Sequence, residues 1–477
     1  MSMQLYNSLT KTIEPFRPIS GRTVRLYACG PTVYHYATIA NLRSYLFEDI
    51  LKRTLLVNGY QVQHVMNITD VGHLTDDADE GEDKLERAAT REQRSAQEIA
   101  QYYTDVFLKD LDRLHIFRPD AMPRATEYIA EQIALVEELE RRGFTYETSD
   151  GVYFDTSKFP AYGKAFKGQK LEEKEAGARV AVRSEKRNPH DFALWKLTPK
   201  EVHRQQEWPS PWGRGFPGWH IECSVMSRAL LGQPFDIHCG GIDHISVHHT
   251  NEIAQSEAAY DVPLAKYWCH GAFLTVDGGR MGKSEGNAVI VEELIERDID
   301  PIAYRYLVLG AHYRSQLNFT WESLESAESA LRHLRDRCRE LPTAPKRINA
   351  ALKPKILKLR ERFLAAVNDD LDTPRALALL WEVMKSKRDA KEVAAAVAFM
   401  DEVLGLGFTD YLGKTLRIPR EVQQLVRDRE KARATKDWAR ADILRAEIAA
   451  LGYVVQDMKD GIKVLENKSV KDDRKST

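Results

Sequence analysis

The first third of the chain alternates strand, helix and strand, and this order limits the fold more than any other feature of the sequence. Residues 24–28 are predicted to form a buried strand, residues 39–57 an amphipathic helix, and residues 61–68 a second strand. Two strands joined by a crossover helix run parallel, and the connection is right-handed. Ligands bind at the carboxyl ends of such strands. We therefore expect an α/β protein with a Rossmann-type parallel sheet, and Cys29 and Thr69 at its ligand-binding edge.

A second strand, turn and helix occur near the middle of the chain. Residues 234–238 are predicted to form a short strand, which the turn Cys239-Gly-Gly-Ile-Asp243 and a helical stretch follow. Glycine allows a ligand to approach the backbone, and an acidic residue just beyond it can accept a hydrogen bond from a ribose hydroxyl. Residues from about 115 to 188 separate the two units, and we interpret them as an insertion.

Two cysteines, a histidine and a glutamate can together supply a tetrahedral zinc site: Cys29, Cys223, His248 and Glu252. His248 and Glu252 are four residues apart in a predicted helix, so both side chains leave one face. If the ion accepts a fifth ligand, a thiol substrate can bind as a thiolate, whereas an alcohol is a far poorer ligand. The alternative is that the cysteines are small buried hydrophobic residues. We expect that simpler role for the other three cysteines, Cys239, Cys269 and Cys338.

The glycine-rich loop at residues 277–287 has three interpretations. A P-loop requires glycine five residues before Gly282, where this chain has Asp277. A serine-hydrolase elbow at Ser284 must lead directly from a strand to a helix, but residues 287–290 intervene before the next helical stretch. The third interpretation is a mobile lysine, Lys283, that neutralises phosphate charge as it develops.

Length and composition favour a large enzyme from a reducing compartment. The chain has 477 residues, enough for several domains, and its five cysteines show no paired spacing, which argues against a disulfide framework. The N-terminus lacks an apolar signal segment, and no stretch reaches the ~18 apolar residues of a membrane span. We therefore expect a cytoplasmic protein that has no membrane partner.

The net charge of −2 does not decide whether the protein binds nucleic acid, because the distribution of charge matters more. Residues 414–445 contain ten Lys or Arg residues against five Asp or Glu residues, in a helical pattern. This excess fits either a surface that contacts phosphates or an ordinary solvated helix face.

Five segments carry a resemblance that extends along most of the chain: Cys29-Gly-Pro-Thr-Val-Tyr34, Asn67-Ile-Thr-Asp70, Asn188-Pro-His-Asp-Phe-Ala-Leu-Trp-Lys196, Pro217-Gly-Trp-His-Ile-Glu-Cys223 and His248-His-Thr-Asn-Glu-Ile-Ala-Gln-Ser256. Together they resemble the motifs of the cysteinyl-tRNA synthetases, which are class I aminoacyl-tRNA synthetases. Residues 369–378 resemble the helical domain of this family, and residues 436–445 resemble its anticodon-binding domain.

The resemblance implies an order of domains along the chain. A Rossmann-type catalytic domain is expected at residues 1–115 and 189–270, interrupted by a connective insertion at 116–188. A KMSKS-loop and stem-contact region is expected at 271–325, an α-helical domain at 326–413, a small anticodon-binding domain at 414–466, and a flexible tail at 467–477.

The resemblance also implies roles for individual side chains. One zinc ion per chain would be held by Cys29, Cys223, His248 and Glu252. Cys29, Thr69 and Trp219 would line the cysteine pocket. The residues expected to bind ATP are Thr38, Asn41, Gly241, Asp243 and Lys283, and those expected to act in catalysis are Lys283, Thr38 and Asn41.

Two motifs depart from the family pattern. The HIGH motif is Thr38-Ile-Ala-Asn41, and threonine can donate a hydrogen bond but cannot carry the charge of an imidazolium. The KMSKS motif is Arg280-Met-Gly-Lys-Ser284, in which Arg280 keeps a positive charge with a different geometry. These departures affect the expected catalytic rate more than the expected substrate.

The resemblance implies a monomeric ligase that activates L-cysteine with ATP and Mg²⁺ and transfers it to tRNA(Cys), with zinc selecting the substrate thiolate. Three alternatives stay open: a paralogue that transfers cysteine to a small amine, a non-catalytic tRNA-binding relative, and the serine hydrolase. In the anticodon-binding domain we expect Arg429, Arg433 and Lys436 to neutralise phosphates. Trp438 is expected in the core of that domain, with stacking on an unpaired base as the alternative.

Overall fold

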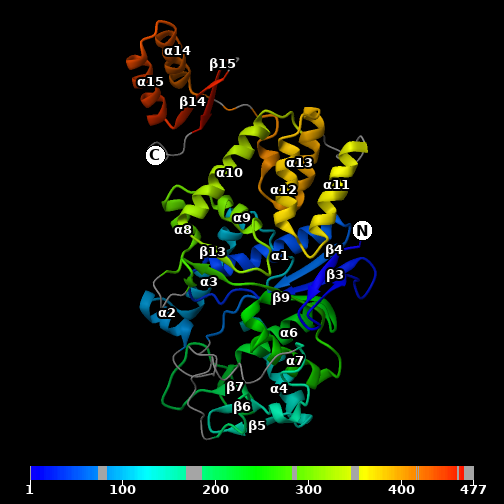
Figure 1. Ribbon diagram of the computed structural model, residues 1–477. Helices are drawn as coiled ribbons and strands as arrows, with labels where there is room; N and C mark the ends of the chain where they lie inside the picture. Colours follow the sequence, from blue (N-terminus) through cyan, green and yellow to red (C-terminus); the bar gives the residue numbers. More distant parts are fainter. Residues whose placement is uncertain are drawn as a thin grey trace.

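A parallel sheet of four strands lies at the centre of the computed structural model, which describes residues 2–72, 83–167, 185–281, 287–344, 354–414, 416, 418–458 and 461–466 (Figure 1). The strand order is β10-β9-β3-β4, and each neighbouring pair is parallel. The bounds are β3 Thr23–Ala28, β4 Gln61–Met66, β9 Phe235–Gly241 and β10 Ala265–Gly271. The predicted Rossmann-type sheet is therefore confirmed, and the second strand ends two residues earlier than expected.

Helices cover both faces of this sheet because successive residues of a strand point to opposite sides. On β3, Leu26 and Ala28 belong to the same hydrophobic core as helix α1 (Ile39–Val57), whereas Tyr27 belongs to the core of helix α6 (Trp219–Leu231). Helix α7 (His248–Tyr260) packs beside α6, and the two lie on the side of the sheet opposite to α1 (Figure 1). Burial on both faces fits the three successive apolar residues that end β3, Leu26, Tyr27 and Ala28.

An antiparallel sheet forms a second layer beyond α6 and α7, in the order β5-β6-β7-β8 (Figure 1). Its strands are β5 Thr145–Thr148, β6 Gly151–Phe154, β7 Phe192–Leu197 and β8 Gly215–Pro217. The sheet thus continues past residue 188, where the insertion was expected to end. The helices of this part of the chain are α2 Lys84–Glu92, α3 Ala96–Arg113 and α4 Ile129–Arg141, with short 3₁₀ turns at η1 Ala125–Tyr128 and η2 Thr156–Lys158.

A buried arginine connects α1 beside the parallel sheet with the helices that follow in the chain. Arg305, in helix α9 (Pro301–Leu309), is fully buried and donates to the Asp49 carboxylate of α1 at 2.6 Å and to the carbonyl oxygen of Leu404 at 2.6 Å. Three helices therefore meet at one charged group. The remaining elements of the body are β1 Gln4–Asn7, β2 Thr12–Pro15, η3 Ile242–Ile245, β11 Leu274–Val276, β12 Gly279–Arg280, α8 Val291–Glu296, α9 Pro301–Leu309, β13 Leu317–Phe319, α10 Trp321–Arg339, α11 Pro354–Val367, α12 Thr373–Met384, α13 Ala390–Leu404 and η5 Phe408–Asp410.

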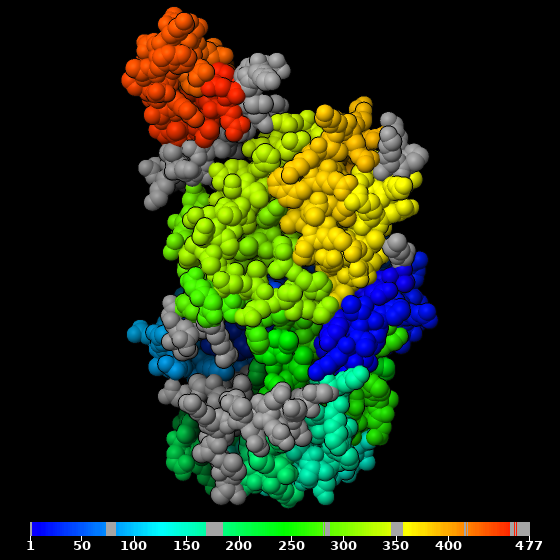
Figure 2. Space-filling model, viewed as in Figure 1, coloured from blue at the N-terminus to red at the C-terminus, as the bar shows by residue number. Residues whose placement is uncertain are grey.

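A small C-terminal domain projects from the helical domain as a separate lobe (Figures 1 and 2). It consists of α14 Arg420–Ala434, α15 Trp438–Ala450, β14 Tyr453–Met458 and β15 Gly461–Glu466. Its own core contains Val422, Ile448 and Val455. Among the described residues, no helix is both long enough and apolar enough to cross a membrane.

The C-terminal domain corrects two expectations. Trp438 is 56% exposed, so the interpretation of this side chain as a core residue is wrong. It opens helix α15, and the guanidinium of Arg433 lies over its ring at 5.5 Å from the centroid. Arg429 is buried and forms two hydrogen bonds with the Asp457 carboxylate, at 2.9 and 3.0 Å, so its charge serves the fold.

Candidate metal and nucleotide site

A cleft of about 890 Å³ opens at the carboxyl ends of β3 and β9, where the strand order of the sheet places a ligand. Side chains of two kinds line it. The floor carries metal-ligating groups, and the rim carries the start of helix α1 and the glycine turn after β9. The expected site residues that line the cleft are Cys29, Thr38, Asn41, Thr69, Trp219, Cys223, Gly241, Asp243 and His248.

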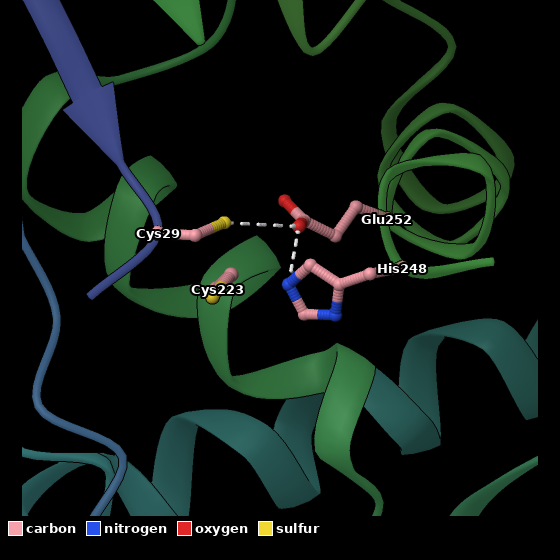
Figure 3. A group of neighbouring side chains, drawn as sticks. All are labelled: Cys29, Cys223, His248 and Glu252. Carbon is pink, nitrogen blue, oxygen red and sulfur yellow. Dashed lines mark hydrogen bonds and ion pairs between the residues drawn. The ribbon is translucent and has the colours of Figure 1, made fainter. Parts of the chain in front are cut away.

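The floor brings the four expected zinc ligands together (Figure 3). Cys29 directly follows β3, Cys223 lies in the second turn of α6, and His248 and Glu252 project from one face of α7. One ligand atom from each residue lies within 4.8 Å of each of the others, and all four residues are buried. In a tetrahedral zinc site with bonds of about 2.0–2.3 Å, neighbouring ligand atoms are about 3.3–3.8 Å apart. The donor set therefore fits zinc in chemistry, and its atoms lie within 4.8 Å of one another, about 1 Å above the spacing in a bound site.

Hydrogen bonds already connect these donors in the protein. Nε2 of His248 lies 2.8 Å from Oε1 of Glu252, and the same oxygen accepts from Sγ of Cys29 at 3.9 Å. The second oxygen of Glu252 contacts Nε2 of His238 at 2.7 Å. One buried carboxylate is thus the common acceptor of the floor.

The pKa values of the two thiols at the floor are shifted in opposite directions. A hydrogen bond from Cys29 lowers the pKa of the Cys223 thiol to about 7 against the opposing effect of burial. Burial, together with Cys223, raises the pKa of Cys29 well above its ordinary value. Burial alone would lower the pKa of His248, but the Glu252 charge and Cys223 raise it to about 10. Because ligands must lose their protons to bind a metal, an ion at this floor would displace protons from these groups.

Further histidines surround the floor, and sequence reasoning did not single them out. Nε2 of His249 lies 3.3 Å from Sγ of Cys29, and Nδ1 of His220 lies 2.9 Å from Nδ1 of His248. His238 contacts Glu252 as described above. His220 and His249 do stand inside the motif segments, three residues before Cys223 and Glu252 in the same helices, so their helical spacing was a signal that could have found them. Only the fold brings the two helices together.

The expected cysteine pocket lies above this floor. The hydroxyl of Thr69 is buried, donates to the Glu222 carboxylate at 3.1 Å and accepts from the Asn67 amide at 2.9 Å. The ring of Trp219 packs on His248 with centroids 4.8 Å apart. A β-carbon at position 30 would lie 1.7 Å from the backbone oxygen of Asn67, so only glycine fits after Cys29. The pocket residues are therefore held in place by close packing and hydrogen bonds.

The rim is built from uncharged groups at the start of α1. Thr38 is the N-cap of this helix: its hydroxyl accepts from the backbone N–H of Asn41 at 3.3 Å, and the Asn41 side chain accepts from the backbone N–H of Thr38 at 3.0 Å. The next backbone N–H, of Ile39, donates to the carbonyl oxygen of Val289 at 2.9 Å. This bond joins the helix to the segment that follows the glycine-rich loop.

The other residues expected to bind the nucleotide are Gly241, Asp243 and Lys283. Gly241 follows His238 at the end of β9, and a β-carbon there would lie 2.3 Å from Oδ1 of Asp243. The glycine thus leaves the Asp243 carboxylate room beside the cleft. Lys283 lies outside the described residues.

Comparisons with known proteins cover nearly the whole chain. The family described as "tRNA synthetases class I (C) catalytic domain" matches residues 15–329, and "Cysteinyl-tRNA ligase anticodon binding domain" matches residues 416–464. Cysteine-tRNA ligase 1 of Burkholderia lata is 50% identical over 97% of this chain and 96% of its own. The cysteine-tRNA ligase of Thermus thermophilus is 42% identical over 97% of this chain and 98% of its own.

A solved structure shares the fold at low sequence identity. Mycobacterium tuberculosis methionyl-tRNA synthetase in complex with methionyl-adenylate is 16% identical, with a TM-score of 0.54 over 81% of this chain and 90% of that chain. The likeness extends the class I architecture to this chain, without bearing on its substrate.

Proposed function

The chain belongs to the cysteinyl-tRNA synthetase family, and we propose that it selects its amino acid through one zinc ion held by Cys29, Cys223, His248 and Glu252. Its reaction is that of a cysteine-tRNA ligase. The enzyme activates L-cysteine with ATP to cysteinyl adenylate, releases pyrophosphate, and transfers the cysteinyl group to tRNA(Cys).

The buried quartet at the floor of the cleft is the observation that carries the proposal. A bound zinc ion would supply a ligand position that a thiolate fills and an alcohol fills poorly. Cys29, Cys223 and His248 line the cleft, so a thiol that enters it reaches the donor set directly. The four side chains have fixed positions because each is buried and bonded to a neighbour.

Activation needs no nucleophile from the protein, because the carboxylate of cysteine attacks the α-phosphate of ATP. The residues of the chain then position the two substrates and stabilise the charge that develops on phosphate. We assign Thr69 and Trp219 to the walls of the cysteine pocket. Gly241 and Asp243 are assigned to the ribose of ATP. We assign Thr38 and Asn41, at the N-terminus of α1, and Lys283, in the glycine-rich loop, to the phosphates of ATP. Mg²⁺ is expected to be bound to the same phosphates.

Transfer of the cysteinyl group requires that the enzyme also bind the tRNA at a surface far from the cleft. The C-terminal lobe is suited to this binding. The lobe matches the anticodon-binding family and presents an exposed Trp438 beside Arg433. We further propose that the enzyme works as a monomer in the cytoplasm, where its five free cysteines would stay reduced.

Aminoacylation of purified tRNA with labelled cysteine tests the whole reaction. We expect cysteine-dependent pyrophosphate exchange and charged tRNA(Cys). Exchange without charging would favour the paralogue that transfers cysteine to a small amine, and the absence of both would favour the non-catalytic relative. The match of residues 416–464 to an anticodon-binding domain argues against the small acceptor, which would give that domain nothing to hold.

A further inference from the structure

We propose that the floor of the cleft contains a second, overlapping donor set for the same ion, formed by Cys29, His238, His249 and Glu252. One ligand atom from each of these residues also lies within 4.8 Å of each of the others, and all four residues are buried. The two sets share Cys29 and Glu252. They differ because His238 and His249 take the places of Cys223 and His248. An ion can therefore move between the sets while Cys29 and Glu252 stay in position.

His249 is oriented as a metal ligand. Its Nε2 faces Sγ of Cys29 at 3.3 Å and lies 4.0 Å from Oε1 of Glu252. Its Nδ1 bonds Nε2 of His270 at 2.8 Å, and Nδ1 of His270 bonds the Ser8 hydroxyl oxygen at 2.7 Å. If each Nδ1–H donates to the next group in this series, the Nε2 lone pair of His249 is directed at Cys29. Ligating histidines are usually fixed in this way through their other ring nitrogen.

His238 and Glu252 are the other two ligands that complete the second set. Glu252 faces His248 with Oε1 and His238 with Oε2, so one carboxylate reaches both sets. The His238 ring is held by stacking on Trp268, with centroids 4.5 Å apart and planes 16° apart. Its Nδ1 has no hydrogen-bond partner among the described residues. Coordination through Nε2 would place the proton on that unpartnered nitrogen, which is unfavourable in a buried site. The second set is therefore the weaker one.

The two sets differ in their access to substrate and in charge. Cys223 and His248 line the cleft, whereas His238 and His249 do not line it and are fully buried. Of the second set only Cys29 lines the cleft, so an ion held there would be less accessible to a thiol in the cleft. A divalent ion with two thiolates and a carboxylate carries a net charge of −1, and one with a single thiolate and a carboxylate is neutral. Burial penalises net charge, which offsets part of the disadvantage of the second set.

The structure thus assigns an open position, which a thiol in the cleft reaches, and a closed position behind it. This inference rests on the proposed function, because both positions serve the same ion. Of the four residues that distinguish the positions, His248 and His249 are neighbours in the sequence and provide matched variants.

Zinc content and affinity of the full-length enzyme test the inference without an activity assay. Wild type and Cys338→Ala, which removes a buried thiol of the helical domain, should each hold one zinc per chain. Cys223→Ala should still hold one zinc, bound at least about tenfold more weakly, and should bind no cysteine. Cys29→Ala, which damages both sets, should retain none.

The decisive comparison is made in the Cys223→Ala background. Adding His249→Gln should weaken zinc by at least a further factor of about ten, whereas adding His248→Gln should change the affinity less than about twofold, as chelator competition measures. The opposite order would mean that the remnant of the first set holds the ion, and would overturn the inference. So would loss of zinc from folded Cys223→Ala and Cys223→Ser.

X-ray absorption at the zinc edge gives an independent reading on Cys223→Ala. Two imidazole ligands and one sulfur ligand would support the second set, and a single imidazole would overturn it. A wild-type enzyme that binds no zinc would instead contradict the proposed function itself, so the two failures are distinguishable.

Discussion

The two ends of the cleft are built from opposite kinds of groups. At the floor, ionisable donors are buried, bonded to one another and shifted in pKa. At the rim, Thr38 and Asn41 are uncharged, lie at the surface and bond mainly to each other. The floor is therefore organised before any substrate arrives, and the rim leaves the stabilisation of phosphate charge to other groups. Under the proposed function, the buried floor selects the amino acid, and the stabilisation of phosphate charge is assigned to Lys283.

The largest expected effect concerns the floor, which should reject serine without an editing step. A thiol ionises on binding to zinc and an alcohol does not, so the key polar bond cannot form with serine. We expect cysteine to exceed serine by at least ~10⁴ in kcat/KM for pyrophosphate exchange. Comparable exchange rates with the two amino acids would remove the zinc floor as the source of selectivity.

Lys283→Ala should affect the nucleotide end alone. Loss of one charge-stabilising donor typically costs roughly 10²–10³ in rate, and the dissociation constant for cysteine should stay nearly unchanged because the floor is intact. Single-turnover activation and cysteine binding measure the two quantities. Lys391→Ala, at an exposed position in α13, is the control. An unchanged activation rate would exclude Lys283 from the mechanism.

Deleting the chain after Gly413 should leave both ends of the cleft working and impair only tRNA charging. We expect the KM for tRNA to rise at least tenfold, which corresponds to ~1.4 kcal/mol, with pyrophosphate exchange largely intact. Equal charging by a folded truncated enzyme would show that the lobe does not hold tRNA.

A narrower variant tests the same lobe through its exposed tryptophan. Trp438→Ala should also raise the KM for tRNA, since stacking of a base on an aromatic ring contributes about 1–3 kcal/mol. Ile443→Ala, at a position of α15 that is 50% exposed, is the matched control. The tRNA contribution of Lys436 should weaken as salt rises, whereas Arg429 and Arg433 both form ion pairs with the Asp457 carboxylate.

The smallest effect is expected for Thr38→His at the rim. An added imidazole can bring charge to the phosphates but removes the hydroxyl that caps α1. We expect equal or higher activation, within a few-fold of wild type by the usual size of a lost cap. A large loss of the activation rate in a stably folded variant would mean that the hydrogen-bonded Thr38–Asn41 pair contributes to activation although neither side chain is charged.

The sequence predicted the parallel sheet and the shared face of His248 and Glu252 because both depend on short-range patterns. The strands expected at 24–28 and 61–68 flank a helix of the predicted length, and His248 and Glu252 occupy one face of a single helix. Bringing Cys29 and Cys223 to them required the family resemblance. His238 and His270 were missed because their approach to the site depends on the packing of β9 and β10 against α7, which no local spacing records. His249 was missed although it is three residues before Glu252 in the same helix.

The errors have physical reasons as well. The antiparallel sheet crosses residue 188 because β7 pairs with β6, a long-range contact across the insertion. Trp438 was assigned to a core by its size and apolar ring, but as the first residue of α15 it lies on the outer surface of a lobe with a small core. Lys283 lies outside the described residues, so its role stays a prediction.

The central claim is that the thiolate of cysteine binds to zinc at the floor of the cleft. Zinc-edge X-ray absorption on the wild-type enzyme tests it most directly, first without amino acid and then with saturating cysteine or serine. We expect two sulfur ligands, from Cys29 and Cys223, that increase to three with cysteine and stay at two with serine. A sulfur count that stays at two in an enzyme with bound cysteine would show that the substrate thiolate does not bind to the ion.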